Sequence, residues 1–264
     1  MFNKQMTIKT ASEIEFLREN GIIVSKTLAE VAKHIQPGVK TITLDKIAED
    51  FIRGEGAVPG FKGYRGFPAT LCISVNEEVV HGIPGERVLK NGDIVSIDCG
   101  CQKDGYYGDS AYTFPVGEVS EEVMNLLKRT KESLYRAVAV AVTGKRVGDI
   151  SAAVQEFVEG YGYSVVRELV GHGIGRQLHE KPDIPNYGKK GWGAKLQTGL
   201  TICIEPMINL GVKSVVQDPD GWTIRTADRM PSAHFELTVA VNKEKADVLS
   251  TFRYIEEVLG SSSI

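Results

Sequence analysis

The first quarter of the chain has apolar residues at the spacing of an α-helix. They recur every three or four positions from Ile14 to Ile35, and Pro37-Gly38 ends the pattern. A second amphipathic helix is predicted to begin with Thr43 as its N-cap and to end at the glycines of 54–56. The pattern therefore predicts a helix-loop-helix unit at the start of the chain.

Short, β-branched segments bounded by glycine or proline follow, and they predict strands. In the first half these strands cover residues 71–75, 93–101 and 105–116. Two longer helical patterns come next, over 119–142 and 149–161. Further strands are predicted near 164–168, 200–205, 223–226 and 235–241. A pair of helices followed by strands thus occurs twice, which suggests two similar halves, although no sequence period proves it.

Three of the predicted strands each carry one acidic residue on their less bulky face. Because side chains alternate between the two faces of a strand, Asp98 faces away from Val95 and Ile97. The same alternation turns Glu205 and Glu236 away from the bulky residues of their own strands. Burying one acid on each of three strands is costly unless those faces meet at cations.

A fourth acid is predicted to join them through a hairpin. The turn residues Lys103-Asp104-Gly105 fold the chain so that Asp98 comes opposite Asp109, or within one place of it. Two buried carboxylates directly opposite each other on paired strands would not both stay ionised unless they shared a cation. Alternatively, Asp109 caps a turn while Asp98 pairs with a lysine, and this pair alone does not decide between the two interpretations.

Histidines supply the other candidate chemistry. His172 lies between glycines that let the backbone turn tightly and approach a ligand, and His179 follows seven positions later. His81 comes at the end of a predicted strand, whereas His34 is predicted on an exposed helix surface and receives no role. His234 shares the parity of the acid two positions later, so it could support a metal ligand or serve an ordinary loop role.

The composition is that of a soluble globular protein. The chain has 264 residues, of which 42% are hydrophobic and 25% charged, and one large domain is expected. No apolar run is long enough to span a bilayer and the start lacks the apolar stretch of a signal peptide, so a cytoplasmic protein without membrane contact is expected. A net charge of -3 argues against broad nonspecific nucleic-acid binding, and no specific nucleic-acid partner is expected.

The four cysteines are interpreted as packing residues. All lie in apolar, strand-like stretches, where a reduced cysteine behaves as a small hydrophobe. The pair Cys99 and Cys101 has no second pair with which to complete a structural zinc site.

Four carboxylates and one imidazole make a site for hard or intermediate divalent ions. Such a site is expected to bind manganese, iron(II) or cobalt, and it does not resemble a structural zinc site, which uses thiolate ligands. Zinc is a further candidate. Four anions balance two dications, and a pair of metals sharing carboxylates is a standard arrangement for hydrolysing a peptide bond. The predicted metal ligands are Asp98, Asp109, His172, Glu205 and Glu236.

Ordered motifs along nearly the whole chain resemble the type I methionine aminopeptidases. This family has the pita-bread fold, which prolidase and creatinase also use. The motifs are 72–77 with 81–84, 91–95 with Asp98, 108–109, 171–175 with His179-Glu180, 204–206, 220–223 and 236–238. The resemblance implies an α+β fold in which two pseudo-symmetric halves share a curved, mostly antiparallel sheet covered by helices on its outer face. A single catalytic domain over 1–264 is expected, with a short lead over 1–9 and no separate N-terminal extension domain.

The resemblance also implies roles for the site residues. Asp98, Asp109 and Glu236 would be bridging or bidentate ligands, and His172 and Glu205 would complete the second metal's shell. Three residues are expected to be catalytic. Glu205 would handle the proton of the attacking water, His179 would stabilise the tetrahedral oxyanion, and His81 would contact the scissile amide and help the leaving amine.

A methionine pocket follows from the same resemblance. Three of its residues differ from the best-known bacterial pattern: Phe61 at the rim replaces a frequent cysteine, Phe67 a tyrosine and Leu178 a phenylalanine. All remain apolar, so methionine selectivity is expected to survive while the pocket volume differs. The residues implied to bind substrate are Tyr64, Phe67, Cys72, His81, Leu178, His179 and Trp222.

The implied activity is removal of the initiator methionine from nascent polypeptides whose second residue is small. The expected cofactors are two divalent ions, the expected partners are nascent N-termini with the ribosome as a candidate, and a monomer is expected. One alternative is a proline-specific pita-bread peptidase, which normally carries an additional N-terminal domain. Another is a non-catalytic binding homologue, although such relatives lose ligands and all five are present here.

Overall fold

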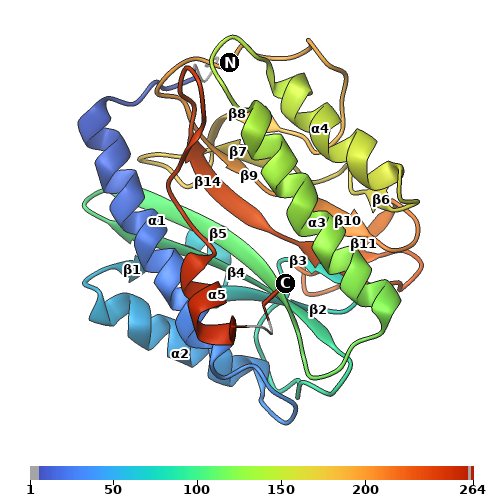
Figure 1. The fold of residues 1–264 in the computed structure, drawn as a ribbon. Helices are drawn as coiled ribbons and strands as arrows, with labels where there is room; N and C mark the ends of the chain where they lie inside the picture. Colours follow the sequence, from blue (N-terminus) through green and yellow to red (C-terminus); the bar gives the residue numbers. More distant parts are fainter. Residues whose placement is uncertain (1–5, 261–262) are drawn as a thin grey trace.

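The computed structural model describes residues 6–260 and 263–264, which form helices packed against one large sheet (Figure 1). The first five residues of the predicted lead, 1–5, lie outside the described ranges. The helices of the described residues are α1 (Ala11–Ala32), α2 (Thr41–Gly54), α3 (Glu121–Val140), α4 (Val147–Glu159), α5 (Arg253–Leu259) and the 3₁₀ turn η1 (Tyr64–Gly66). None of these helices is long and apolar enough to cross a lipid bilayer.

The opening helix pair forms where the apolar spacing predicts it. A capping box starts α1, because the Thr10 hydroxyl accepts from the Glu13 amide while the Glu13 carboxylate accepts from the Thr10 amide. The prediction of Thr43 as the cap of α2 is wrong, since that helix begins at Thr41. The backbone amide of Thr41 donates to the carbonyl of Arg87 at 3.0 Å, so a contact from a distant loop replaces a side-chain cap.

Nine strands of the described chain make the main sheet, and every pairing in it is antiparallel. Seven follow the order β1-β4-β5-β14-β9-β7-β8, while β2 pairs with β4 and β15 with β14. The two halves of the molecule meet where β5 pairs with β14. The strands are β1 (Val58–Pro59), β2 (Leu71–Val75), β4 (Ile94–Lys103), β5 (Tyr106–Pro115), β7 (Gly171–Gly173), β8 (Glu180–Ile184), β9 (Thr201–Ile204), β14 (Glu236–Ala240) and β15 (Asp247–Val248).

Two small three-stranded sheets flank the main one. In the first, β10 (Met207–Asn209) lies between β13 (Ser232–His234) and β6 (Ser164–Val165). In the second, β12 (Ile224–Thr226) lies between β11 (Val215–Gln217) and β3 (Glu78–Val80). Most of these short strands escape prediction, because strands of two or three residues leave too few positions for an alternating pattern.

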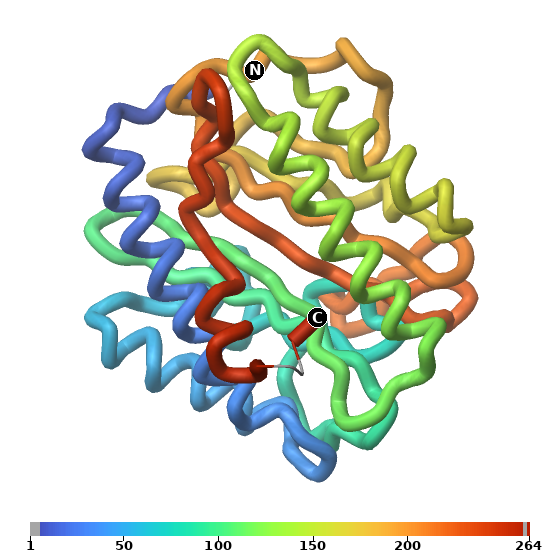
Figure 2. Tube along the Cα trace, in the orientation of Figure 1, coloured from blue at the N-terminus to red at the C-terminus, as the bar shows by residue number. Residues whose placement is uncertain are grey.

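The helices cover one face of the main sheet, as the trace in Figure 2 shows for α1 and α3. The main hydrophobic core fills the space between, and it takes Ile97 from β4, Ile202 from β9 and Val239 from β14. The predicted parity of these strands is therefore confirmed, and their acids lie on the opposite face. The predicted α+β pita-bread fold is confirmed, including its mostly antiparallel sheet and its outer layer of helices.

The hairpin between β4 and β5 has a different register from the predicted one. Asp104 and Gly105 both have positive φ, of 53° and 78°, and form a two-residue turn between Lys103 and Tyr106. Asp109 consequently pairs with Gly100, two places from Asp98. The prediction that Asp98 and Asp109 lie opposite each other, or within one place, is wrong. A displacement of two residues still keeps both acids on one face of the sheet as diagonal neighbours.

Candidate metal centre

The five predicted ligands converge on one cavity at the junction of the two halves. Asp98 and Asp109 come from β4 and β5, His172 from β7, Glu236 from β14, and Glu205 directly follows β9. All five line a cavity of about 290 Å³. The sheet thus brings together side chains that lie up to 138 residues apart in sequence (236 − 98).

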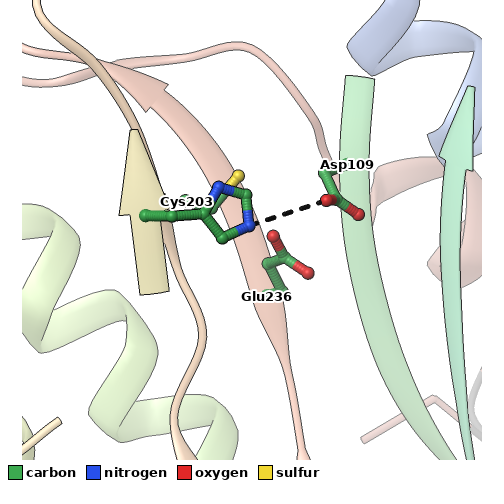
Figure 3. A group of neighbouring side chains, drawn as sticks. Asp109, Cys203 and Glu236 are labelled. Atoms are coloured by element: carbon green, nitrogen blue, oxygen red, sulfur yellow. Dashed lines mark ion pairs between the residues drawn. The ribbon is translucent and has the colours of Figure 1, made fainter. Parts of the chain in front are cut away.

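Distances within this group suit a shared cation. His172 Nε2 lies 3.8 Å from Asp109 Oδ2, the pair joined by the dashed line in Figure 3, and 3.6 Å from Glu205 Oε1. Glu236 lies beside Asp109 in the same view. Potential ligand atoms of Asp109, His172, Glu236 and Cys203 all fall within 4.8 Å of one another.

The carboxylates of this centre lack the partners that would normally stabilise buried charge. Oδ1 of Asp98, Oδ1 of Asp109 and Oε1 of Glu236 are buried and have no hydrogen-bond partner among the described residues. Burial raises the pKa of Asp98 to about 7, and burial together with neighbouring acids raises the pKa values of Asp109, Glu205 and Glu236 well above the ordinary range. Unpaired oxygen atoms that converge in this way fit a divalent cation.

The imidazole of His172 is prepared as a neutral ligand. Its Nδ1 lies 2.9 Å from the carbonyl of Gly173, and because a carbonyl only accepts, Nδ1 carries the proton. The lone pair of Nε2 therefore faces the acids. Burial lowers the pKa of His172 to about 4, so the ring remains neutral near physiological pH.

The glycines beside His172 serve a different purpose from the predicted one. Residues 171–173 form strand β7 rather than a tight turn. A Cβ atom on Gly171 would lie 2.4 Å from the carbonyl oxygen of Cys203, and one on Gly173 would lie 2.6 Å from that of Lys181. Close packing of β7 between its neighbours, not turning of the chain, therefore requires glycine on both sides of the histidine.

Cys203 is the member of the group that the sequence did not single out. It packs in a buried hydrophobic cluster, as predicted for the cysteines, but its thiol also lies next to Glu236 (Figure 3). Burial and the charge of Glu236 raise the pKa of this thiol well above its ordinary value, and the sulfur contacts the Thr238 hydroxyl at 3.4 Å. A protonated thiol is a poor metal ligand, so Cys203 is a neighbour of Glu236 and not one of the proposed ligands.

Addition of a divalent cation to the metal-free protein at about pH 7 is expected to release protons. Ligating carboxylates must be ionised, but burial raises the pKa of Asp98 to about 7, and burial with neighbouring acids raises the pKa values of Asp109, Glu205 and Glu236 well above their ordinary range. His172 contributes no proton because it is already neutral. Metal affinity should consequently rise with pH between about 6 and 8. Titration calorimetry in two buffers of different ionisation enthalpy counts the protons, and equal heats in both buffers would contradict the expectation.

The rest of the cavity is lined mostly by apolar and aromatic side chains. Every residue predicted to bind substrate lines it, and so does Phe61. The Phe67 and Trp222 rings meet edge to face at 5.1 Å, and the His81 ring lies 6.4 Å from Trp222. Sequence reasoning missed the remaining lining residues, which no motif signals because they come from loops and from elements of only three residues. They are Arg65, Val80, Glu168, Leu169, Val170 and Met207.

One partly buried arginine ties together the strands that carry Trp222 and His81. In β12, the Arg225 guanidinium donates to Asp218 at 2.6 Å and to Glu77 at 2.9 Å, and it pairs with Glu78 of β3 at 2.9 Å. Strand β12 follows Trp222 and β3 precedes His81. The arginine therefore joins the two strands on which this wall of the cavity depends.

His81 and His179 both line the cavity. His81 has a left-handed backbone, with φ of 60°, and Gly82 next to it passes so close to Ile73 that a Cβ would lie 2.2 Å from its carbonyl oxygen. His179 lies at the exposed rim, where its Nδ1 is 2.9 Å from the Tyr64 hydroxyl. Partial burial and the nearby His172 lower the pKa of His179, which favours its neutral form.

The two histidines left without a firm role lie in different environments. His34 is about half exposed near the end of α1, 3.7 Å from Glu30, in agreement with its predicted surface position. His234 is not in a loop, because it ends strand β13. Its side chain is buried, with Nε2 3.8 Å from Glu205 Oε2. Burial lowers the pKa of His234 to about 3.

Comparison with known proteins agrees with the fold and the site. The model of metallopeptidase family M24 matches residues 15–243. Methionine aminopeptidase 1 of Bacillus subtilis is 51% identical over 242 residues, which are 92% of this chain and 98% of that protein. Methionine aminopeptidase of Clostridium acetobutylicum is 50% identical, over 92% of this chain and 98% of that protein.

Solved structures give the same result. The crystal structure of methionine aminopeptidase from Thermotoga maritima matches with a TM-score of 0.92 and 44% identity, covering 94% of this chain and all of that one. Prolidase from Pyrococcus furiosus matches with a TM-score of 0.74 at 24% identity over 92% of this chain and 65% of that one, which shows a common fold alone. The chain therefore belongs to metallopeptidase family M24, among the methionine aminopeptidases.

Proposed function

We propose that this metallo-aminopeptidase removes the initiator methionine from polypeptides whose second residue is small, with two divalent ions held by Asp98, Asp109, His172, Glu205 and Glu236. The observation that carries the proposal is one cavity in which four carboxylates and an imidazole adjoin an aromatic pocket. The methionine aminopeptidases to which the chain is 40–51% identical support the substrate.

The ligand set supports the proposed kind and number of ions. Oxygen and imidazole ligands suit manganese, iron(II) or cobalt, with zinc as a further candidate. The nearest thiol, Cys203, is held protonated by burial and therefore does not turn the centre into a thiolate zinc site. Four carboxylates that are buried together balance the charge of two dications, whereas one dication would leave two negative charges without compensation.

Divalent ions bound there would polarise the scissile carbonyl and lower the pKa of the attacking water. Glu205, at the cavity wall, takes the proton of that water and passes it to the leaving amine. His81, which also lines the cavity, contacts the scissile amide and helps the leaving amine depart. Its left-handed backbone aims the ring toward Trp222 and the cavity.

His179 stabilises the oxyanion of the tetrahedral species. If the Tyr64 hydroxyl donates to Nδ1 across the 2.9 Å contact, the neutral ring carries its proton on Nε2. That N–H is then free to donate to the negative oxygen as it develops. Tyr64 in this way selects the tautomer that the reaction needs.

The pocket suits a linear apolar side chain. Phe61, Phe67, Cys72 and Leu178 are buried in one cluster, and Cys72 pairs with Asp98 in the strand register. Substrate contacts are assigned to Tyr64, Phe67, Cys72, His81, Leu178, His179 and Trp222. Replacement of a frequent phenylalanine by leucine at 178 removes ring volume, and phenylalanine at 61 supplies some at the rim, so selectivity for methionine is kept with a changed cavity shape.

Two alternatives receive less support. A proline-specific peptidase shares the fold, but prolidase from Pyrococcus furiosus is 24% identical and this chain covers 65% of it. A non-catalytic binding homologue would have lost metal ligands, whereas all five candidate ligands converge here.

A metal-reconstituted assay tests the proposal. The metal-free protein, supplied in turn with manganese, iron(II), cobalt or zinc, is expected to release methionine from Met-Ala-Ser and to leave Met-Phe-Ser and Ala-Pro peptides nearly uncut. Cleavage of the Xaa-Pro peptide in preference would favour the proline-specific alternative. Inactivity toward all peptides with every ion would favour the binding homologue.

The setting of the activity is also a proposal. Nascent N-termini are the physiological substrates, with the ribosome as a candidate partner, and the enzyme acts as a monomer in the cytoplasm. All four cysteines are free in the structure, which suits a reducing compartment.

A further inference from the structure

We propose that His234 is a positioning residue that orients the Glu205 carboxylate by donating its Nε2–H to Oε2. The inference rests on the proposed function, in which Glu205 binds metal and handles the proton. It assigns a purpose to a buried histidine two positions from Glu236 that is neither one of the five ligands nor part of the cavity wall.

Glu205 lies between two imidazoles. His172 Nε2 is 3.6 Å from Oε1 on one side, and His234 Nε2 is 3.8 Å from Oε2 on the other. The two histidines come from different parts of the fold, β7 of the main sheet and β13 of a small sheet. Each oxygen of the carboxylate therefore has its own imidazole.

No other described residue holds the carboxylate at hydrogen-bond distance. The backbone carbonyl of Glu205 accepts from the Asn186 side chain at 2.9 Å, but that contact leaves the side-chain torsions free. A carboxylate that must take a proton and bind a cation needs a fixed orientation. The imidazole of His234, with Nε2 3.8 Å from Oε2, is placed to supply that donor.

The backbone of His234 is held in place more firmly than a simple packing residue requires. Its amide donates to the Thr113 hydroxyl at 2.9 Å, and the same hydroxyl donates to its carbonyl at 2.7 Å. Ser96 contacts that hydroxyl at 2.8 Å, so β4 and β5 both fix the position of β13. These strands also carry Asp98 and Asp109, which couples the placement of His234 to that of the metal ligands.

The buried imidazole of His234 makes no hydrogen bond to any described residue. The residue is 1% exposed, and neither ring nitrogen has a hydrogen-bond partner among the described residues. Leaving a buried donor without a hydrogen-bond acceptor destabilises the folded protein. A shift of about 0.8 Å would bring Nε2 and Glu205 Oε2 into hydrogen-bond range, and such contacts commonly tighten when a site is filled.

The proposed contact gives the two oxygen atoms of Glu205 different roles. A donor on Oε2 leaves Oε1, the oxygen beside His172, available to the cation and to the transferred proton. His234 does not line the cavity, so it acts through Glu205 and never touches the substrate. Its removal should therefore change kcat and metal affinity, with KM nearly unaffected.

Two substitutions separate a donor from a packing residue. His234→Leu fills a similar space without a donor, whereas His234→Gln keeps an N–H. We expect the leucine variant to lose about 10–100-fold in kcat on Met-Ala-Ser and in affinity of the metal-stripped protein for cobalt, and the glutamine variant to recover most of both. His34→Leu, at an exposed histidine, is the matched control and should match the wild type.

Retention of kcat and cobalt affinity by the leucine variant, within about twofold, would overturn the proposal. An equal loss in both variants would also overturn it. If the leucine variant fails to fold, a measurement of the His234 tautomer in the wild-type protein still tests the proposal. In long-range ¹H–¹⁵N spectra of histidine-labelled protein, the Nε2–H tautomer of His234 is expected, and the Nδ1–H tautomer would refute the contact.

The experiment distinguishes this inference from the proposed function. A wild-type protein inactive on Met-Ala-Ser with every ion would refute the function. The cobalt affinities and the His234 tautomer would still show whether His234 orients Glu205.

Discussion

Replacing Glu205 with glutamine is expected to lower kcat/KM for Met-Ala-Ser by about 10³-fold, or about 4 kcal/mol of transition-state stabilisation. Glutamine keeps the shape of the side chain but cannot accept a proton, and it is a weaker ligand. Glu205 is flanked by His172 at 3.6 Å and has no alternative acid that could take over from the same position, because Asp98, Asp109 and Glu236 come from other strands.

The assay needs equal metal loading to isolate the proton transfer. Activity should be measured across cobalt concentrations until it saturates, so that weaker binding is compensated. Asp183→Asn is the matched control, because Asp183 pairs with His172 in the strand register but its carboxylate is 55% exposed and contacts Lys181. A Glu205→Gln enzyme within tenfold of the wild type at saturating cobalt would show that another group handles the proton.

Gly108→Ala is expected to lower the free energy of unfolding by about 3 kcal/mol. A Cβ at this position would lie 2.5 Å from the backbone carbon of Asn20, because α1 packs directly on β5 there. Overpacking a tight contact costs about 1–3 kcal/mol, and here the obstacle is backbone that cannot rotate away. The next residue is Asp109, so relief of the clash would also displace a proposed ligand.

Urea unfolding of the metal-free protein measures this effect without a contribution from bound metal. Gly54→Ala is the matched control, since a Cβ there meets no atom within 4 Å and alanine favours the helix in which Gly54 lies. We expect Gly54→Ala to be neutral or slightly stabilising. Equal midpoints for the two variants would disprove the close helix-strand contact.

Local patterns predict the main helices and strands because their physical cause is local. The spacing of Leu17, Val24 and Leu28 buries one face of α1 whatever lies beneath it. Side chains alternate between the two faces of a strand whatever strand lies next to it. Alternation in β4, in β14 and through β9 to the residue after it therefore turns Asp98, Glu236 and Glu205 away from the core. Short strands such as β3, β11 and β13 form because neighbours supply their hydrogen bonds, and no local pattern encodes that.

Register shows where local reasoning fails. The turn residues around Asp104 predict a hairpin, but the number of residues in the turn decides which side chains meet, and the two positive φ values of Asp104 and Gly105 place Asp109 opposite Gly100. The acids still converge, because a two-residue displacement preserves the face. A displacement by one would have sent Asp109 into the core.

The sequence by itself determined the five candidate ligands, the face on which the strand acids lie and the resemblance to methionine aminopeptidases. Residue type and alternation are properties of the chain alone. Only the tertiary structure decided that Cys203 lies beside Glu236, that Arg225 joins β12 to β3 and that His234 lies near Glu205. These contacts join residues on separate strands, and their distances depend on how the sheets pack, which no pattern along the chain records.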